Sequence, residues 1–235
     1  MTQYPTNISF GELDTPPAAR PNGWRGAACL LPTAYFAPVQ WWQKAYRYGT
    51  IYIEQHDHFA KQTFRNRCVI ATTNGLQPLT VPVERPEGGR LDKTPVREVR
   101  VSDHGEWRKQ HWNALCSAYG ESPFFEFYAD DLQPFFTRKW EFLFDFNMAI
   151  THKMCELLGF QPTIVPTTEY GVAGSTNIPA EADFREAIHP KHPLPDPDFT
   201  PTPYYQVYRL RHGFQPNLSI LDLLCNMGNE AVLYL

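Results

Sequence analysis

The fold of this chain is decided by the stretch Thr50-Ile51-Tyr52-Ile53-Glu54-Gln55-His56-Asp57. Its first four residues are predicted to form a strand, which delivers the chain directly into Glu54. Residues 27–31 form a short apolar run before Pro32, which suits an earlier buried strand. Between the two strands, residues 39–48 carry aromatic and apolar side chains at helical spacing, and Gly49 then ends the helix. This strand–helix–strand opening is typical of an α/β protein with a parallel sheet.

The middle of the chain predicts a β-hairpin. Residues 67–71 and 76–83 flank Asn74-Gly75, which is a strong turn signal. Pro78 and Pro82 lie in the second arm, so this arm is expected at an edge or at a bulge. A further strand is predicted over residues 96–101.

The later elements are mostly helical. Asp103 and Glu106 resemble a capping box for a helix that runs to about Tyr119. The other expected elements are a short helical turn at Ser122-Pro123, a long helix from Pro134 to Gly159, a last parallel strand over 160–165 and a helix over 219–224.

These elements predict an α/β protein with one domain. We expect a central mixed, mostly parallel sheet flanked by helices, with one β-hairpin and a Pro-rich late loop. The domain is expected over residues 27–235, after an irregular N-terminal arm over residues 1–26. Residues 166–216 are loop-rich, and we interpret them as a lid, with a surface wrap as the alternative.

The composition is that of a globular protein, with 43% hydrophobic and 20% charged residues among 235. The net charge of −4 gives no global basic field for nucleic acid or an anionic membrane, but it does not exclude a local basic pocket. No apolar stretch approaches the ~20 residues that span a bilayer, and the N-terminus does not resemble a signal peptide. We therefore expect a cytoplasmic protein. The five cysteines are dispersed, which argues against disulfides or a zinc finger and predicts small buried hydrophobes.

The main candidate site is the polar run that follows the second strand, from Glu54 to Arg67. Ligands of open α/β sheets bind outside the carboxyl ends of the strands, and the run begins there. His56 and Asp57 would form an acid–base unit with Glu54 nearby, and Lys61 with the two arginines that follow would hold a carboxylate or phosphate. The alternatives are a solvated loop whose charges neutralise one another and a metal site at His56-x-His58.

Other candidates lie elsewhere in the chain. His104 precedes a helix and would point into the site, or Ser102 and Asp103 would serve only as a cap. The turn 32–38 has no dinucleotide or P-loop fingerprint, and its aromatic residues would stack on a ring or pack in the core. The late loop adds polar and aromatic groups. The candidate substrate-binding residues are Tyr35, Phe36, Gln55, Lys61, Arg65, Asn66, Arg67, Arg185, Lys191, Tyr204 and Gln206, and no metal ligand is assigned.

Several of these motifs together resemble the WbqC-like family, in particular its Bacteroidetes-type members. The motifs are Leu31 to Pro38, Glu54 to Asp57, Arg65-Asn66-Arg67, Leu79 to Val83, Trp107 to Tyr119 and Pro216 to Leu224. The resemblance covers the chain from about Cys29 to its end. Other members vary around Asp-Asp-Val-Gln where this chain has Glu54-Gln55-His56-Asp57, so the resemblance does not transfer a role to His56.

The resemblance implies a link to O-antigen and other cell-surface polysaccharide pathways, where attachment of glycine or another amino acid to a sugar is suggested. Our preferred hypothesis is an acyl- or aminoacyl-type transferase whose partner is a sugar or nucleotide-sugar. An activated acyl or nucleotide donor would serve it, and no cofactor is assigned. In this hypothesis His56 is the general base, oriented by Asp57 or Glu54. The alternatives are a non-catalytic protein that binds a glycan intermediate or a partner, and a metal-dependent hydrolase.

Overall fold

The computed structural model describes residues 28–171 and 178–235, so the expected N-terminal arm lies outside the described residues. The chain opens as the sequence predicts, with strand β1 (Ala28–Pro32), helix α1 (Val39–Arg47) and strand β2 (Thr50–Glu54). β1 and β2 are parallel, and Pro32 lies opposite Glu54. The polar run therefore starts where both strands end.

The expected last parallel strand is also present, as β5 (Thr163–Pro166). It pairs with the other side of β2, which gives the order β1-β2-β5 with β2 in the centre. Ile51 and Ile53 of β2 are buried, as expected for an inner strand covered on its faces. Because the three strands are parallel, the residues that follow them meet at one edge of the sheet.

The hairpin forms a sheet of its own. β3 (Arg67–Thr72) and β4 (Gly75–Thr80) are antiparallel, and Gly75 has a φ of 106°, which only glycine adopts readily. Among the strands of residues 28–171 and 178–235, β4 pairs only with β3, and this edge position tolerates Pro78. The structure confirms the fold class: a single α/β domain with a three-stranded parallel sheet and a separate β-hairpin, flanked by helices.

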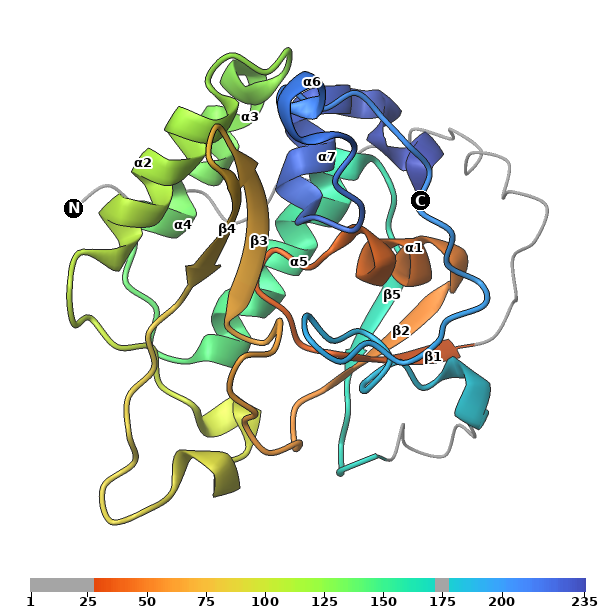
Figure 1. Ribbon diagram of the computed structural model, residues 1–235. Coiled ribbons are helices and arrows are strands. Elements are labelled where there is room, and N and C mark those ends of the chain that lie inside the picture. The colour runs from red at the N-terminus through yellow and green to blue at the C-terminus, as the bar shows by residue number, and fades with distance from the viewer. Residues whose placement is uncertain (1–27, 172–177) are drawn as a thin grey trace, which may run out of the picture.

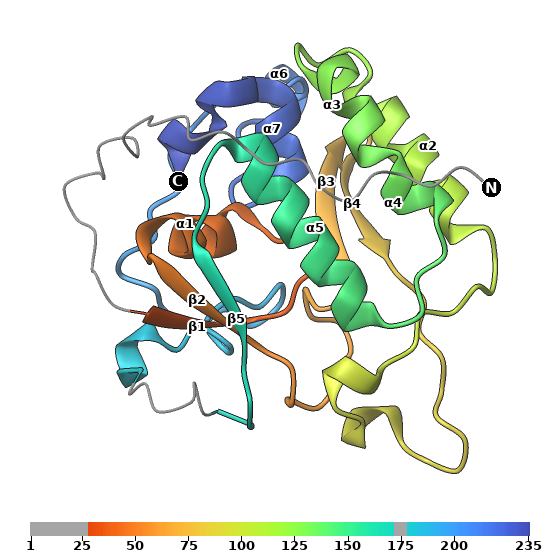
Figure 2. The same cartoon turned by 180° about the vertical axis from the view of Figure 1, so that it is seen from behind.

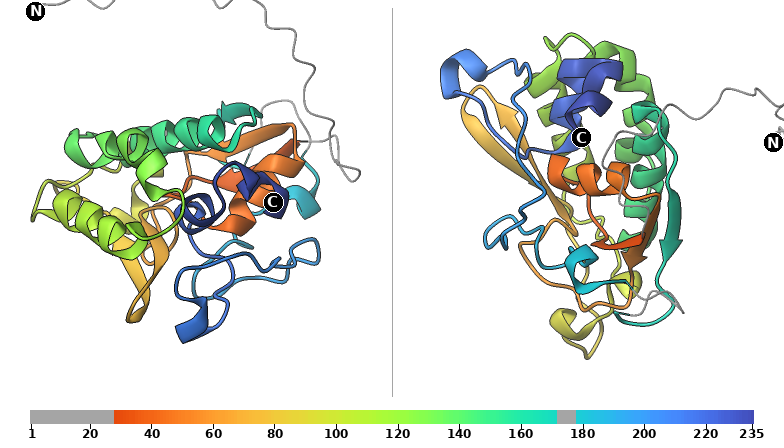
Figure 3. Two further views of the ribbon diagram at one scale, coloured as in Figure 1. Left: turned by 90° about the horizontal axis from the view of Figure 1, so that it is seen from above. Right: turned by 90° about the vertical axis from the view of Figure 1, so that its right-hand side faces the viewer.

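Helices surround both sheets. In Figure 1 the hairpin lies beside α2, α3 and α4, while α1 lies with the parallel sheet. Figure 2 shows the same arrangement from behind, where α5 crosses the molecule. Figure 3 places α5 and β5 on one side, and the hairpin with the late segment on the opposite side. The helices are α2 (Trp107–Tyr119), α3 (Phe125–Leu132), α4 (Pro134–Thr137), α5 (Leu143–Leu158), α6 (Arg209–His212) and α7 (Ile220–Met227). Short 3₁₀ helices are η1 (Leu91–Lys93), η2 (Val96–Glu98), η3 (Ala180–Ala182) and η4 (Gly228–Tyr234).

Two sequence predictions in the middle of the chain are wrong for a shared reason. The long helix expected from Pro134 is interrupted after α4, and the strand expected over 96–101 is replaced by η2 and isolated bridges. The backbone of Val101 donates to Glu141, and Leu143 donates to Val99. This tertiary pairing keeps residues 141 and 142 out of the helix, so local periodicity did not decide the outcome.

The capping box expected at Asp103 is also wrong. α2 begins only at Trp107, and its N-cap residue makes no side-chain hydrogen bond. Asp103 instead forms ion pairs with Arg108 and Lys139. Gly105 has a φ of 72°, which keeps the preceding residues in a turn.

Candidate functional site

The buried carboxylate of Glu54 is the centre of the polar network at the end of β2. Its side chain is shielded from solvent, and each of its oxygens accepts two hydrogen bonds. Oε1 accepts from the His56 backbone at 2.8 Å and from Thr167 Oγ1 at 2.9 Å. Oε2 accepts from the Gly171 backbone at 2.8 Å and from Arg185 Nη1 at 3.2 Å. Glu54 therefore organises the site and has no lone pair left for a substrate proton.

The imidazole of His56 is oriented by a backbone carbonyl. Its Nε2 lies 3.1 Å from the carbonyl oxygen of Thr167, the residue that follows β5, and Gln55 Nε2 donates to the same oxygen at 2.6 Å. A carbonyl only accepts, so His56 Nε2 carries the proton and Nδ1 of the neutral ring is free of one. This corrects the expectation that Asp57 or Glu54 orients the ring. Nδ1 is the atom of this cluster able to act as a base.

Asp57 is paired with Arg65 rather than with a histidine. The two side chains form an ion pair, and that of Arg65 is almost fully buried. The backbone oxygen of Arg65 also accepts from Asn147 of α5 at 2.8 Å. Because Asp57 neutralises it, Arg65 is not a free cation for a substrate anion, which corrects the gripping role expected of it.

The neighbours of Arg65 hold the hairpin in place. Asn66 Nδ2 donates to the Val81 backbone, and Arg67 Nε donates to Thr80 Oγ1. The first contact lies just beyond the open end of the hairpin, and the second joins β3 to β4. Lys61 is exposed to solvent. The structure therefore does not bring Asn66 and Arg67 into contact with the Glu54 network.

The late segment, residues 178–206, contacts the polar run as expected of a covering loop. Arg185 reaches Glu54, and Lys191 Nζ donates to Gln62 Oε1. Asp183 binds Arg185 through Nε and Nη2, and these hydrogen bonds raise the pKa of the guanidinium. The contact is confirmed, and the opening of this segment as a lid remains a prediction.

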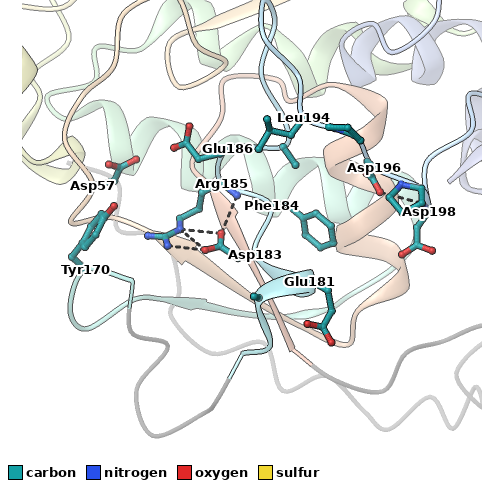
Figure 4. Close-up of a pocket in the computed structure, with 14 residues that line it drawn as sticks. Asp57, Tyr170, Glu181, Asp183, Phe184, Arg185, Glu186, Leu194, Asp196 and Asp198 are labelled. Carbon is teal, nitrogen blue, oxygen red and sulfur yellow. Dashed lines mark hydrogen bonds and ion pairs between the residues drawn. The ribbon is translucent and has the colours of Figure 1, made fainter.

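A cavity of about 500 Å³ lies between the polar run and the late segment. Figure 4 shows Asp57 and Tyr170 at one end, Asp196 and Asp198 at the other, and the ring of Phe184 between them. Among the described residues that line it, Arg185 is the one cationic side chain, and its guanidinium lies over the ring of Tyr170. The carboxylates of the wall are Asp57, Glu181, Asp183, Glu186, Asp196 and Asp198.

Tyr35 and Phe36 do not reach the cavity. Both rings are buried in the core, where Tyr35 bonds His111 and Phe36 stacks on Phe136. A ring with no exposed face offers nothing for a ligand to stack on, so the role expected of these residues is not retained. Phe36 also has a φ of 38°, and this strained turn places its ring inward.

Tyr204 and Gln206 are structural as well. Tyr204 Oη donates to Asp222 Oδ2 at 2.7 Å, and Gln206 Nε2 donates to the same oxygen at 2.9 Å. Burial raises the pKa of Asp222. This buried cluster fastens the end of the late segment to α7. His104 is exposed in the turn before α2, and its backbone bonds Ser102.

Sequence reasoning missed the partners of Glu54 and the ion pair behind the cavity. Thr167 follows β5, and its position at the sheet edge was recoverable from the parallel register. Asp183 lies two residues before Arg185, and this spacing is a weaker sequence signal that the two side chains pair. Lys44 and Asp196 form a buried pair at 2.8 Å, and no local pattern joins residues so far apart in sequence.

The cysteines are unsuited to nucleophilic catalysis. Four are buried, and Cys116 is partly exposed. Burial raises the pKa of Cys68 and of Cys155 to about 12, and it raises those of the other three as well. A thiol with such a pKa is protonated near pH 7, whereas the nucleophile is the thiolate.

Two further observations on the described residues concern a metal site and a membrane-spanning helix. Within them, no three or more His, Cys, Asp or Glu side chains are grouped to hold a metal ion, so His56 and His58 gain no further ligand. This offers no support for the metal-dependent hydrolase. Across residues 28–171 and 178–235, no helix combines the length and apolar character needed to cross a membrane.

The fold and the site define an α/β protein with a ligand-sized cavity beside β1, and the Asp57 and Tyr170 end of this cavity lies at the carboxyl edge of the parallel sheet. The chain belongs to the WbqC-like protein family, whose model matches residues 33–190, and this confirms the family that the motifs predict. It is similar to a protein of Mycobacterium tuberculosis described as uncharacterized protein Rv1507c. The two are 31% identical over 196 residues, which cover 75% of this chain and 83% of that protein. No solved structure matches the chain.

Proposed function

We propose that the chain is an acyl- or aminoacyl-type transferase that acts on an amine-bearing sugar or nucleotide-sugar. The observation that carries this proposal is the wall of the cavity, which holds six carboxylate side chains and two aromatic rings against a single guanidinium. Three of these carboxylates, Asp57, Asp183 and Asp196, already have cationic partners. Glu181 and Glu186 are exposed at its rim. Such a wall favours a positively charged amino group on the part of the ligand that enters the cavity.

Acyl transfer to an amine needs a base, and we assign this role to His56, the residue that precedes Asp57 of the cavity wall. The bond to Thr167 selects the neutral tautomer with its proton on Nε2, in which Nδ1 is the basic nitrogen. In the proposed step the bound ammonium first gives one proton to His56 Nδ1, and the free amine nitrogen then attacks the carbonyl carbon of an activated donor. The C–N bond forms, the bond to the leaving group breaks, and the second N–H proton departs with the leaving group. Transfer is direct, because the protonated cysteines do not serve as acyl carriers.

The acceptor proposal is tested by calorimetric titration with UDP-glucosamine and with UDP-N-acetylglucosamine, which lacks the cationic amine. We expect the free amine to bind at least tenfold more tightly. Glu186→Gln should weaken that preference by removing one carboxylate, whereas Glu126→Gln, an exposed change on α3, should leave it unchanged. Equal affinity for the two nucleotide-sugars would reject the amine-binding site.

A non-catalytic binding protein would use the same cavity without needing His56. Substitution of His56 therefore distinguishes a transferase from a binding protein. With UDP-glucosamine and the N-acetylcysteamine thioester of glycine as donor, the wild type should form the glycyl amide. His56→Gln should slow turnover on the order of 100-fold, because general base catalysis contributes that much, with the affinity for UDP-glucosamine retained. Tight binding without product in any variant would instead identify a binding protein.

A further inference from the structure

Helix α1 presents a polar stripe to the far end of the cavity. Gln40, Lys44 and Arg47 are spaced i, i+4 and i+7, so they share one face of the helix. Lys44 is almost fully buried, and its Nζ lies 2.9 Å from Asp196 Oδ1 and 2.8 Å from Asp196 Oδ2. The same ammonium lies 4.8 Å from the centre of the Phe184 ring. One buried cation therefore contacts two residues of the cavity wall.

The other two residues of the stripe contact the same short stretch. Gln40 Nε2 donates to Asp196 Oδ2 at 2.8 Å, and Arg47 Nη1 donates to the backbone oxygen of Asp198 at 3.0 Å. The Asp198 backbone in turn donates to Asp196 Oδ1 at 3.2 Å. Asp196 and Asp198 are thus fixed to α1 through three hydrogen bonds and to each other through a fourth, whereas Arg185 fixes the opposite wall to Glu54.

The energetics of the pair argue for a role other than stability. Burial lowers the pKa of Lys44, so desolvation outweighs the attraction of Asp196. For Asp196, burial alone would raise the pKa, but the hydrogen bonds from Lys44 and Gln40 outweigh it and hold the pKa below its ordinary value. A buried ion pair of this kind is often replaced by apolar residues without loss of stability, while removal of one partner is costly.

We propose that Lys44 is a positioning residue: through Asp196 it holds the far wall of the cavity, and with it the carboxylate of Asp198, in the geometry that receives the ligand. The two walls are stretches of the late segment on either side of residues 188–193. The wall with Asp196 is attached to α1 through Lys44, and the wall with Arg185 is attached to Glu54 at the end of β2. The binding part of this inference rests on the proposed function, and the positioning part does not.

The test uses the full chain with Lys44→Met/Asp196→Asn, which removes both charges and keeps an oxygen for the Asp198 amide. Lys44→Arg is the conservative variant. Amide exchange followed by NMR reports on the wall at Asp198 and, as an internal reference, on the opposite wall at Arg185, whose amide donates to Asp183. Calorimetric titration with UDP-glucosamine reports on the ligand.

We expect the double variant to melt close to the wild type, with exchange at Asp198 at least tenfold faster, exchange at Arg185 unchanged and UDP-glucosamine bound at least tenfold more weakly. Lys44→Arg should restore the slow exchange and most of the affinity. Wild-type exchange at Asp198 in the double variant would overturn the proposal. So would faster exchange throughout β1 and α1, since Lys44 would then support the fold alone. Failure of wild-type protein to bind UDP-glucosamine would reject the proposed function, and exchange at Asp198 would still decide the positioning role.

Discussion

Arg185 Nη1 lies 3.2 Å from Glu54 Oε2, although 131 residues separate the two side chains in the sequence. This ion pair joins the end of the central strand to the late segment. The carboxylate also receives the backbone amide of Gly171, so three separate parts of the chain meet on one buried group. The geometry of the site therefore depends on a charge that solvent does not reach.

Glu54→Gln should be strongly destabilising. The amide keeps the shape but loses the charge, and its nitrogen cannot accept the two hydrogen bonds that each carboxylate oxygen accepts. Breaking a buried ion pair from one side typically costs 3–5 kcal/mol, and we expect about 3 kcal/mol here because Arg185 keeps Asp183. Urea unfolding measures this. Glu98→Gln, which removes an exposed pair with Arg97, should change the free energy of unfolding by less than about 1 kcal/mol. Equal effects of the two changes would contradict the central role of Glu54.

Tyr204→Phe tests the buried cluster on Asp222. The substitution removes a hydrogen bond of 2.7 Å to a buried carboxyl group and should cost about 2 kcal/mol of unfolding free energy. Its neighbour Tyr205 is more than half exposed, so Tyr205→Phe is a matched control with an expected change within about 0.5 kcal/mol. Urea unfolding of both variants compares them directly. An equal loss of unfolding free energy in Tyr205→Phe and Tyr204→Phe would contradict a stabilising role for the Tyr204 hydrogen bond.

Stability should fall in mild acid because of His111. Burial lowers the pKa of this histidine from 6.5 to about 4, and a hydrogen bond to the backbone of Thr80 opposes the shift only in part. Between these values the unfolded chain binds a proton that the folded chain does not, so stability rises with pH across this window and is lost as pH falls. The shift corresponds to a loss of up to about 3 kcal/mol by pH 4.

The contribution of His111 is isolated by comparing the wild type with His111→Gln. Unfolding free energies measured from pH 7 to pH 4 should show a steeper decline for the wild type than for the variant. A difference between the two that does not change with pH would show that His111 takes up its proton equally in the folded and unfolded chains.

Thiol labelling should distinguish Cys116 from the other cysteines. Burial and the raised pKa values should keep Cys29, Cys68, Cys155 and Cys225 unreactive towards a chromogenic disulfide reagent at pH 8. Cys116, which is partly exposed, should react slowly, and all five should react in denaturant. Rapid reaction of a second thiol in the folded protein would show that one of the buried four is accessible.

The local sequence predicted the elements whose signals are short-range. The turn at Asn74-Gly75, the helix over 39–48 and the strands around it need only residues close to one another, and all are present. The same strand–helix–strand pattern placed Glu54 at the carboxyl edge of a parallel sheet. Ser219 caps α7 as a local signal should, since its side chain accepts from the Leu221 backbone.

The tertiary structure decided which side chains pair with one another. A list of charged residues does not say that Asp57 neutralises Arg65, or that Thr167 rather than a carboxylate orients His56. It also does not say that Tyr35 turns into the core. The sequence by itself determined the family, the strand–helix–strand opening and the place of the site, because these follow from local patterning and from parallel register. Which side chains remain free for a ligand depends on contacts between distant segments, and only the folded chain decides those.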